Sequence, residues 1–100
     1  MVEVRQTERF VQWLADLRDL RARAKVQARI ERLIGGNPGD VKPVGAGVSE
    51  LRINYGPGYR VYYLQRGSAL IILLAGGDKS SQVKDIDEAL LLADNLTEEI

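Results

Sequence analysis

The feature that most constrains the fold is a change in the spacing of apolar residues near residue 41. Between residues 8 and 34, apolar side chains recur every three or four positions, which is the spacing of amphipathic helices. From residue 48 onward, apolar and polar residues alternate, which is typical of strands with one buried face. Helices that come first and strands that follow, joined by glycine turns, indicate an α+β fold.

The first part of the chain predicts a short strand over residues 2–5, followed by two helices. Thr7 is the expected N-cap of the first helix, and Asp19 that of the second. Glycines and a proline at residues 35–39 end the second helix. The short connection between the helices predicts a helical hairpin. The expected buried stripe of the first helix is Phe10, Trp13, Leu14 and Leu17. The apolar face of the second is formed by Ala22, Val26, Ile30, Leu33 and Ile34.

The second part predicts three strands over residues 48–54, 59–65 and 69–75, with turns at 56–58 and 67–68. Residues 69–75 are apolar on both faces, which indicates a central strand covered on both sides. A last helix should begin at a Ser80 or Ser81 cap. We therefore expect one α+β domain over residues 1–100: a twisted antiparallel sheet, made of the short N-terminal strand and a three-stranded meander, packed on a two-helix hairpin, with a C-terminal helix.

Composition excludes several classes of chemistry. The chain has no cysteine and no histidine, so it holds no disulfide, no thiolate metal site and no Ser-His-Asp triad. An enzyme of this composition would work with Arg, Lys, Tyr and carboxylates. No apolar run approaches the roughly 20 residues of a membrane helix. The first residues lack the apolar region of a signal peptide, and we expect a cytoplasmic protein.

The net charge is zero, but the two signs are separated along the chain. Residues 1–66 carry twelve basic and seven acidic residues, whereas residues 67–100 carry two basic and seven acidic ones. A basic side is typical of proteins that meet nucleic acid or an acidic partner. The alternative is a solvated basic helix beside a solvated acidic one.

The strand pattern brings several cations to one surface. Arg60 and Tyr62 share a face of their strand, Arg52 can lie on the matching face of the preceding strand, and Lys79 follows the next strand. Arginine binds phosphate through its two-pronged guanidinium, and tyrosine can stack on an unpaired base. These four residues are therefore a candidate site for a nucleic-acid phosphate.

The same segments allow other interpretations. Glu50 or Asp78 could pair with these cations across the strands while the tyrosines simply pack. The glycines at 56–58 join two strands and supply no helix start for a phosphate, and residues 76–81 lack the spacing of a nucleotide-binding P-loop.

Two motifs together resemble a known family. Residues 50–63 (ELRINYGPGYRVYY) and 76–82 (GGDKSSQ), followed by Asp85 and Ile86, resemble the RelE/ParE toxin superfamily. The resemblance is closest to its HigB-like "addiction module killer" branch, which is related to phage Gp49. It implies a type II toxin held inactive by a co-encoded antitoxin. RelE-like members cleave mRNA, usually on the ribosome and without a metal, whereas ParE-like members poison DNA gyrase.

The resemblance also implies roles for individual residues. The arginine of the family's Tyr-Arg pair corresponds to Arg60, which would hold the scissile phosphate, and basic positions of the family correspond to Arg52 and Lys79. The catalytic residues we expect are Arg60, Arg52 and Lys79, and the expected substrate-binding residues are Tyr62, Tyr55 and Lys42.

The chain departs from the family pattern at two positions. Some RelE-type enzymes have a basic residue where this chain has Glu50, and several nucleolytic members have a tyrosine or histidine near the position of Ile86. These departures leave the groups that transfer protons unassigned.

Three functions remain open at this point. The first is a ribosome-dependent mRNA endonuclease that needs no metal and no cofactor; the second is a gyrase inhibitor; the third is a decayed toxin that still binds an antitoxin. The expected partners are an antitoxin, mRNA and the ribosome. Direct binding to duplex DNA and to membranes is not expected, since the net charge is zero and no apolar segment is long enough.

Overall fold

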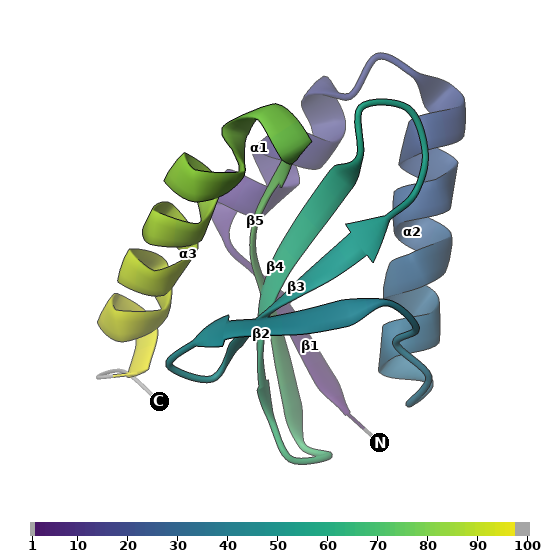
Figure 1. Cartoon of the computed structure of the whole chain (residues 1–100). Coiled ribbons are helices and arrows are strands. Elements are labelled where there is room, and N and C mark those ends of the chain that lie inside the picture. Colours follow the sequence, from purple (N-terminus) through teal and green to yellow (C-terminus); the bar gives the residue numbers. More distant parts are fainter. Residues whose placement is uncertain (1, 98–100) are drawn as a thin grey trace.

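Residues 2–97 are described by a computed structural model in which one five-stranded sheet carries helices on both faces (Figure 1). The strand order is β1-β5-β4-β3-β2. The expected α+β class and the C-terminal helix are confirmed. In chain order the elements are β1 (Glu3–Gln6), α1 (Glu8–Asp16), α2 (Leu20–Ile34), β2 (Val41–Gly45), β3 (Val48–Ile53), β4 (Tyr59–Arg66), β5 (Leu70–Asp78), the 3₁₀ helix η1 (Lys79–Ser81) and α3 (Gln82–Thr97).

The first two helices begin where the sequence predicts. The Thr7 hydroxyl accepts a hydrogen bond from the Phe10 amide at 3.1 Å. The Asp19 carboxylate accepts from the amides of Arg21 and Ala22 at 2.9 and 3.2 Å. Each cap satisfies amides that lack a partner inside the helix, which stabilises a helix by about 1 kcal/mol.

The start of the last helical segment differs from the prediction. Asp78, and not Ser80 or Ser81, caps η1: its carboxylate accepts from the Ser80 amide at 2.8 Å, and Ser81 closes a capping box. The cap therefore lies at the end of β5, and α3 continues directly from the 3₁₀ turn.

The sheet contains two features that the sequence did not indicate. β1 runs parallel to its neighbour β5, so the sheet is mixed and only the strands from β5 to β2 are antiparallel. The parallel pairing is possible because most of the chain lies between the two strands. β2 is an additional edge strand, and it contains Pro43 at a bulge, a place where the ladder does not need an amide.

Each face of the sheet has its own apolar core. α1 and α2 cover one face, and α3 covers the other. The first core contains Phe10, Val26, Ile30, Leu33, Leu51, Ile53, Val61, Tyr63, Ile71 and Leu73; the second contains Val48, Tyr62, Leu64, Leu70, Ile72, Leu74, Ala75, Ala89 and Ala93. The prediction that residues 69–75 are covered on both sides is confirmed for residues 70–75, which are all buried.

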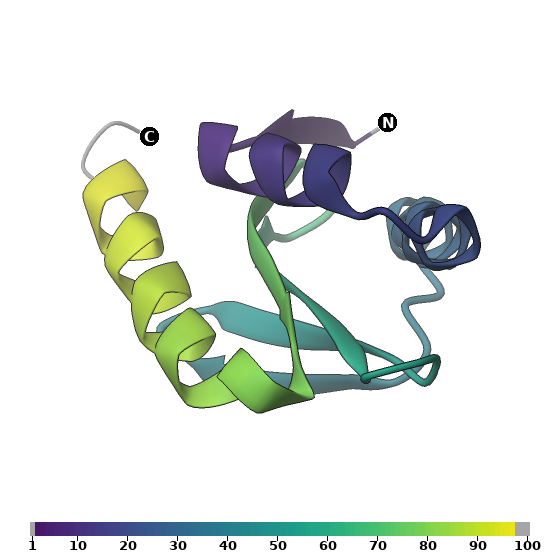
Figure 2. The ribbon, with the colours of Figure 1, turned by 90° about the horizontal axis from the view of Figure 1, so that it is seen from above.

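The two N-terminal helices follow each other but are not side-by-side partners. In Figure 2, α1 is seen from the side and α2 is seen end-on, so the two helices point in different directions. Each helix contributes its own residues to the first core, α1 through Phe10 and α2 through Val26, Ile30 and Leu33. The hairpin is therefore stabilised through the sheet beneath it. No helix within residues 2–97 is long and apolar enough to cross a membrane.

A bulge in β5 decides which helix meets each glycine of the GG pair. The register shifts between Tyr62 and Tyr63, and Gly77 then pairs with Arg60 on the face that α3 covers. A Cβ atom on Gly76 would overlap the indole of Trp13, and one on Gly77 would overlap the carboxylate of Asp85. The two glycines thus let α1 and α3 approach the same strand from opposite sides.

Candidate functional site

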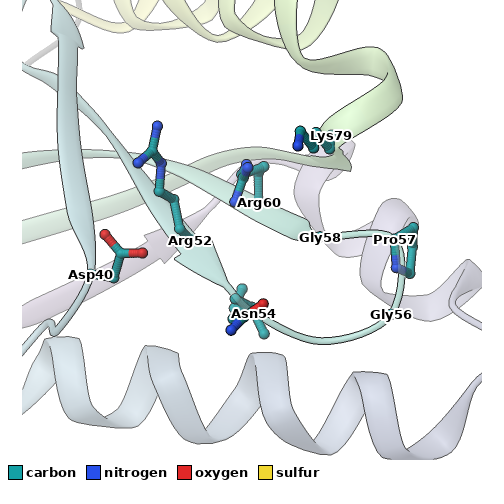
Figure 3. Close-up of a pocket in the computed structure, with 9 residues that line it drawn as sticks. Asp40, Arg52, Asn54, Gly56, Pro57, Gly58, Arg60 and Lys79 are labelled. Carbon is teal, nitrogen blue, oxygen red and sulfur yellow. The ribbon is translucent and has the colours of Figure 1, made fainter.

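Three of the predicted cations line one pocket at the end of the β3–β4 pair. Arg52 comes from β3, Arg60 from β4, and Lys79 from the first residue of η1. Figure 3 shows the three side chains along one rim of the pocket, with Asp40 on the other side of Arg52. The pocket has a volume of about 370 Å³, and its other lining residues are Asp40, Ile53, Asn54, Gly56, Pro57 and Gly58.

The two arginines lie directly opposite each other across the strands. Arg52 and Arg60 are register partners in the antiparallel β3–β4 pair. Like charges in this arrangement destabilise a sheet unless something neutralises them. The neutralising group is Glu50: its Oε1 lies 2.9 Å from Arg52 Nε, and its Oε2 lies 4.0 Å from Arg60 Nε. The cross-strand pairing weighed from the sequence is therefore present, with one carboxylate shared by two cations.

Glu50 is fully buried, with 0% of its surface exposed, and its carboxylate accepts three hydrogen bonds. Besides Arg52, the Tyr62 hydroxyl donates to Oε2 at 3.1 Å, and the Gln82 amide donates to the same oxygen at 2.8 Å. Burial alone would raise the pKa of this carboxyl. The donors outweigh burial and hold the pKa of Glu50 below its ordinary value, so the group is ionised.

Arg52 and Arg60 differ in the hydrogen bonds that their guanidiniums make. The hydrogen bond to Glu50 raises the pKa of Arg52, whose guanidinium is a cation like that of every arginine. Arg60 is more enclosed, with 13% of its side chain exposed, and its buried Nε has no hydrogen-bond partner. Within residues 2–97 the terminal nitrogens of both guanidiniums have no acceptor. They can therefore donate to an anion in the pocket.

The third cation is positioned by the cap of η1. Asp78 accepts from both the amide and the hydroxyl of Ser80, and these hydrogen bonds lower the pKa of Asp78 below its ordinary value. Lys79 lies between Asp78, which is the cap, and Ser80, which donates to it, and the Lys79 side chain is exposed. Its ammonium group is thus presented to the pocket by an ordered turn.

The structure corrects the predicted role of Tyr62. Its ring is 0% exposed, and its hydroxyl is bonded to Glu50. Burial and the neighbouring carboxylate raise the pKa of Tyr62. A ring enclosed in this way cannot stack on a base, so Tyr62 is a support for Glu50 and not a surface for substrate.

The other two predicted substrate-binding residues do not line the pocket. The Tyr55 hydroxyl donates to Asp19 at 3.3 Å, and the Lys25 ammonium lies 5.1 Å from the centre of the Tyr55 ring. Lys42 is exposed on edge strand β2, in register with Glu50. Tyr55 borders a separate hollow, which it shares with Ile53 and Asn54 of the first pocket. A substrate role for Tyr55 and Lys42 stays a prediction.

Part of the basic face of α2 serves the fold. The Arg29 guanidinium donates to the backbone carbonyls of Arg52 at 2.6 Å and Pro38 at 2.9 Å. Arg23 donates to the carbonyls of Ala15 and Leu17 at the end of α1. These two arginines satisfy carbonyls that would otherwise lack donors, so they add less to a binding surface than their number suggests.

The sequence did not single out Asp40 and Gln82. Asp40 lines the pocket, and its carbonyl accepts from the Arg52 amide at 3.0 Å. Gln82 reaches Glu50 across 32 positions of sequence. The "SSQ" of the second motif was the available signal for Gln82. Among the residues of known placement, no three carboxylates gather to hold a metal ion.

Comparisons with other proteins place the chain among phage-related sequences. The model of a family described as phage-derived protein Gp49-like (DUF891) matches residues 12–98. A Haemophilus influenzae protein described as uncharacterized is 53% identical over 95 residues, which cover 95% of this chain and 96% of that protein. No solved structure matches this chain. The Gp49 part of the resemblance is confirmed, and the wider RelE/ParE and HigB-like relationship stays a prediction.

Proposed function

Because the chain belongs to the phage-derived Gp49-like family, we propose that it is the toxin of a type II toxin–antitoxin system and that it cleaves mRNA on the ribosome. The observation that carries the proposal is the convergence of Arg52, Arg60 and Lys79 on one pocket. A phosphate is the anion that suits two guanidiniums and an ammonium. Since translating ribosomes are the proposed target, the toxin acts in the cytoplasm.

The cations would act on the phosphate that joins two nucleotides. The ribose 2′-oxygen loses its proton and forms a bond to the adjacent phosphorus, while the bond from phosphorus to the 5′-oxygen breaks. The products are a 2′,3′-cyclic phosphate and a 5′-hydroxyl, which gains a proton. Arg60 and Arg52 stabilise the negative charge that develops on the phosphorane oxygens, which is often the largest contribution to such a reaction.

The pocket also offers groups for the two proton transfers. The Asp40 carboxylate is the proton acceptor among the lining residues, and the Lys79 ammonium is a proton donor. We assign removal of the 2′-proton to Asp40 and protonation of the 5′-oxygen to Lys79. Such groups contribute roughly 10²–10⁴-fold each, so loss of either should slow cleavage without abolishing it. This assignment requires no metal and no cofactor.

The proposal implies three partners. A co-encoded antitoxin must hold the chain inactive in the cell, and mRNA on the ribosome is the substrate. Duplex DNA is not a partner of the isolated chain, because its fourteen basic and fourteen acidic residues cancel. Any contact with operator DNA would come through the antitoxin.

The test is expression of the chain without an antitoxin, with growth, methionine incorporation and primer-extension mapping of transcripts as readouts. The wild type should arrest translation and leave cut transcripts. Arg60→Ala should reduce cleavage by about 10²–10³-fold, since it removes a preorganised donor. Arg66→Ala is the matched control: it removes an exposed arginine from the other end of the same strand and should cut like the wild type.

Glu50 supports a second candidate, a toxin that has lost its activity and remains an antitoxin-binding module. One carboxylate neutralises part of the charge of Arg52 and Arg60, at a position where some RelE-type enzymes have a cation. Absence of growth arrest by the wild type would favour this candidate. Double-strand DNA breaks with intact transcripts would instead identify a gyrase inhibitor, and cleavage by Arg60→Ala at the wild-type rate would refute the proposed site.

A further inference from the structure

The buried carboxylate behind the pocket has a more specific role than charge neutralisation. We propose that Glu50 is a positioning residue, which holds the guanidiniums of Arg52 and Arg60 so that their terminal nitrogens face the pocket. This inference rests on the proposed function, because the phosphate it serves is that of the RNA substrate.

Glu50 is placed to act through the arginines and not on the substrate. It is fully buried and does not line the pocket, whereas both arginines do. Its contact with Arg52 is made to Nε, at 2.9 Å, and its approach to Arg60 is also from the Nε side, at 4.0 Å. On Arg52, this acceptor on Nε leaves the two terminal nitrogens free to form a bidentate pair with a phosphate. Arg60 has no hydrogen bond at Nε and is attracted to Glu50 by charge alone.

The carboxylate is itself held from two other elements. Tyr62 donates from β4, and Gln82 donates from the first residue of α3, both to Oε2. Arg52 occupies Oε1. With both oxygens engaged, the side chain of Glu50 has one orientation, which acts on Arg52 through a hydrogen bond and on Arg60 through charge attraction at 4.0 Å.

The arrangement of charges explains why a carboxylate occupies this position. Arg52 and Arg60 are cross-strand partners, and without an anion between them their repulsion would turn the guanidiniums apart. A single carboxylate offsets one of the two charges, so the pair keeps a net positive charge, to which Lys79 adds. Three other carboxylates lie nearby: Asp40 lines the pocket, Asp78 caps η1 next to Lys79, and the buried Asp85 accepts a hydrogen bond from Ser81.

The opposite role for Glu50 makes a contrary prediction. If Glu50 mainly competed with the phosphate for the arginines, removing its charge would strengthen phosphate binding and speed cleavage. If it positions the arginines, Glu50→Gln should weaken both, although it leaves a more positive pocket. The sign of the effect therefore separates the two roles.

The first measurement is independent of RNA cleavage. In ¹⁵N spectra of the whole chain, the Nε–H signals of Arg52 and Arg60 should shift and broaden in Glu50→Gln, whereas Glu31→Gln, a change of an exposed glutamate on α2, should leave them in place. Titration with inorganic phosphate should move these signals in the wild type at a lower phosphate concentration than in Glu50→Gln. Unchanged arginine signals, or tighter phosphate binding by the variant, would overturn the inference.

The second measurement uses cleavage in a translation extract. Glu50→Gln should lower kcat by about 10²-fold, because a small displacement of a charge-stabilising group costs about that much, and it should raise KM by a smaller factor. In the Glu50→Gln background, Arg52→Ala should cost less than it does in the wild type, since its guanidinium is already misplaced. Full additivity of the two changes would indicate a purely structural role and would refute positioning.

A second variant keeps the inference testable if Glu50→Gln fails to fold. Gln82→Ala leaves the carboxylate in place and removes one of its donors. It should broaden the Arg52 and Arg60 signals to a smaller extent, and unchanged signals would contradict the proposal. If the wild type cuts no RNA but the spectra respond as described, the proposed function fails while the positioning role of Glu50 stands.

Discussion

At the end that carries Arg52 and Arg60, the two faces of the β3–β4 pair are stabilised in different ways. Toward α1 and α2, the face consists of apolar side chains such as Leu51 and Val61, and its stability comes from burial of hydrocarbon. Toward α3, the same strands carry Glu50 and Arg52 beside Arg60, and the repulsion between the two arginines is offset by the one carboxylate that they share. The comparison shows that one strand pair can contribute apolar side chains to a core on one side and line a pocket with cations on the other.

The largest effect should come from the apolar face. Leu51→Ala removes a fully buried side chain and should lower the free energy of unfolding by about 2–5 kcal/mol in urea denaturation. Leu20→Ala is the matched control: Leu20 is 72% exposed, and the change should stay within about 0.5 kcal/mol. Equal losses for the two variants would contradict the assignment of the core.

The charged face should respond to loss of a single donor. Tyr62→Phe keeps the buried ring but removes the hydroxyl that donates to Glu50, so the free energy of unfolding should fall by about 1.5–3 kcal/mol, the range for hydrogen bonds to charged groups. Tyr59→Phe, on the opposite face of the same strand, should change it by less than about 0.5 kcal/mol. A stable Tyr62→Phe variant would mean that Glu50 does not depend on this donor.

The next largest effect on stability is expected where α1 packs against β5. Gly76→Ala forces a methyl group against Trp13, and overpacking of this kind should cost about 1–3 kcal/mol by thermal or urea unfolding. Gly35→Ala tests the same substitution where the backbone is helical and the neighbours are at ordinary distances, and it should be close to neutral. If both variants were neutral, α1 would not lie as close to β5 as described.

The smallest expected effect is a pH dependence that belongs to one carboxyl group. Because the folded-state pKa of Glu50 lies below its ordinary value of 4.5, ionised Glu50 stabilises the fold above that pH, and this contribution is lost as the pH falls through the lower, folded-state pKa. The free energy of unfolding of the wild type should therefore fall more steeply with acid than that of Glu50→Gln. If the plots of unfolding free energy against pH were parallel for the two proteins, ionised Glu50 would not stabilise the fold. The pKa of Asp78 is also lowered, but Asp78 is present in both proteins and so does not cause a difference between them.

Local signals in the sequence predicted much of this architecture. Thr7 and Asp19 cap the helices as expected, because a cap depends on three or four neighbouring residues. Alternation placed Arg52 and Arg60 on matching faces, and the structure brings both to one pocket with Lys79. Both successes rest on patterns that span only a few neighbouring residues.

The features that were missed depend on contacts between distant segments. β2 contains Pro43 and glycine, so its sequence does not favour a strand, and only pairing with β3 makes it one. Alternation predicts that Tyr62 and Arg60 lie on the same face of β4, but it does not predict which part of that face α3 covers. For this reason the burial of Tyr62 was not expected. The parallel direction of β1 likewise becomes visible only once the whole chain is assembled.

Arg29 has a consequence for experiments on the basic helix. Its guanidinium joins α2 to the carbonyls of Pro38 and of Arg52, the strand residue that also lines the pocket. Reversing its charge would therefore disturb the backbone beneath the pocket as well as remove a positive group from the surface. If a variant at Arg29 bound RNA more weakly, its melting temperature would have to be compared with that of the wild type before the loss is assigned to a missing RNA contact. A loss of binding by a variant at the exposed Arg32 can be assigned to a missing contact directly.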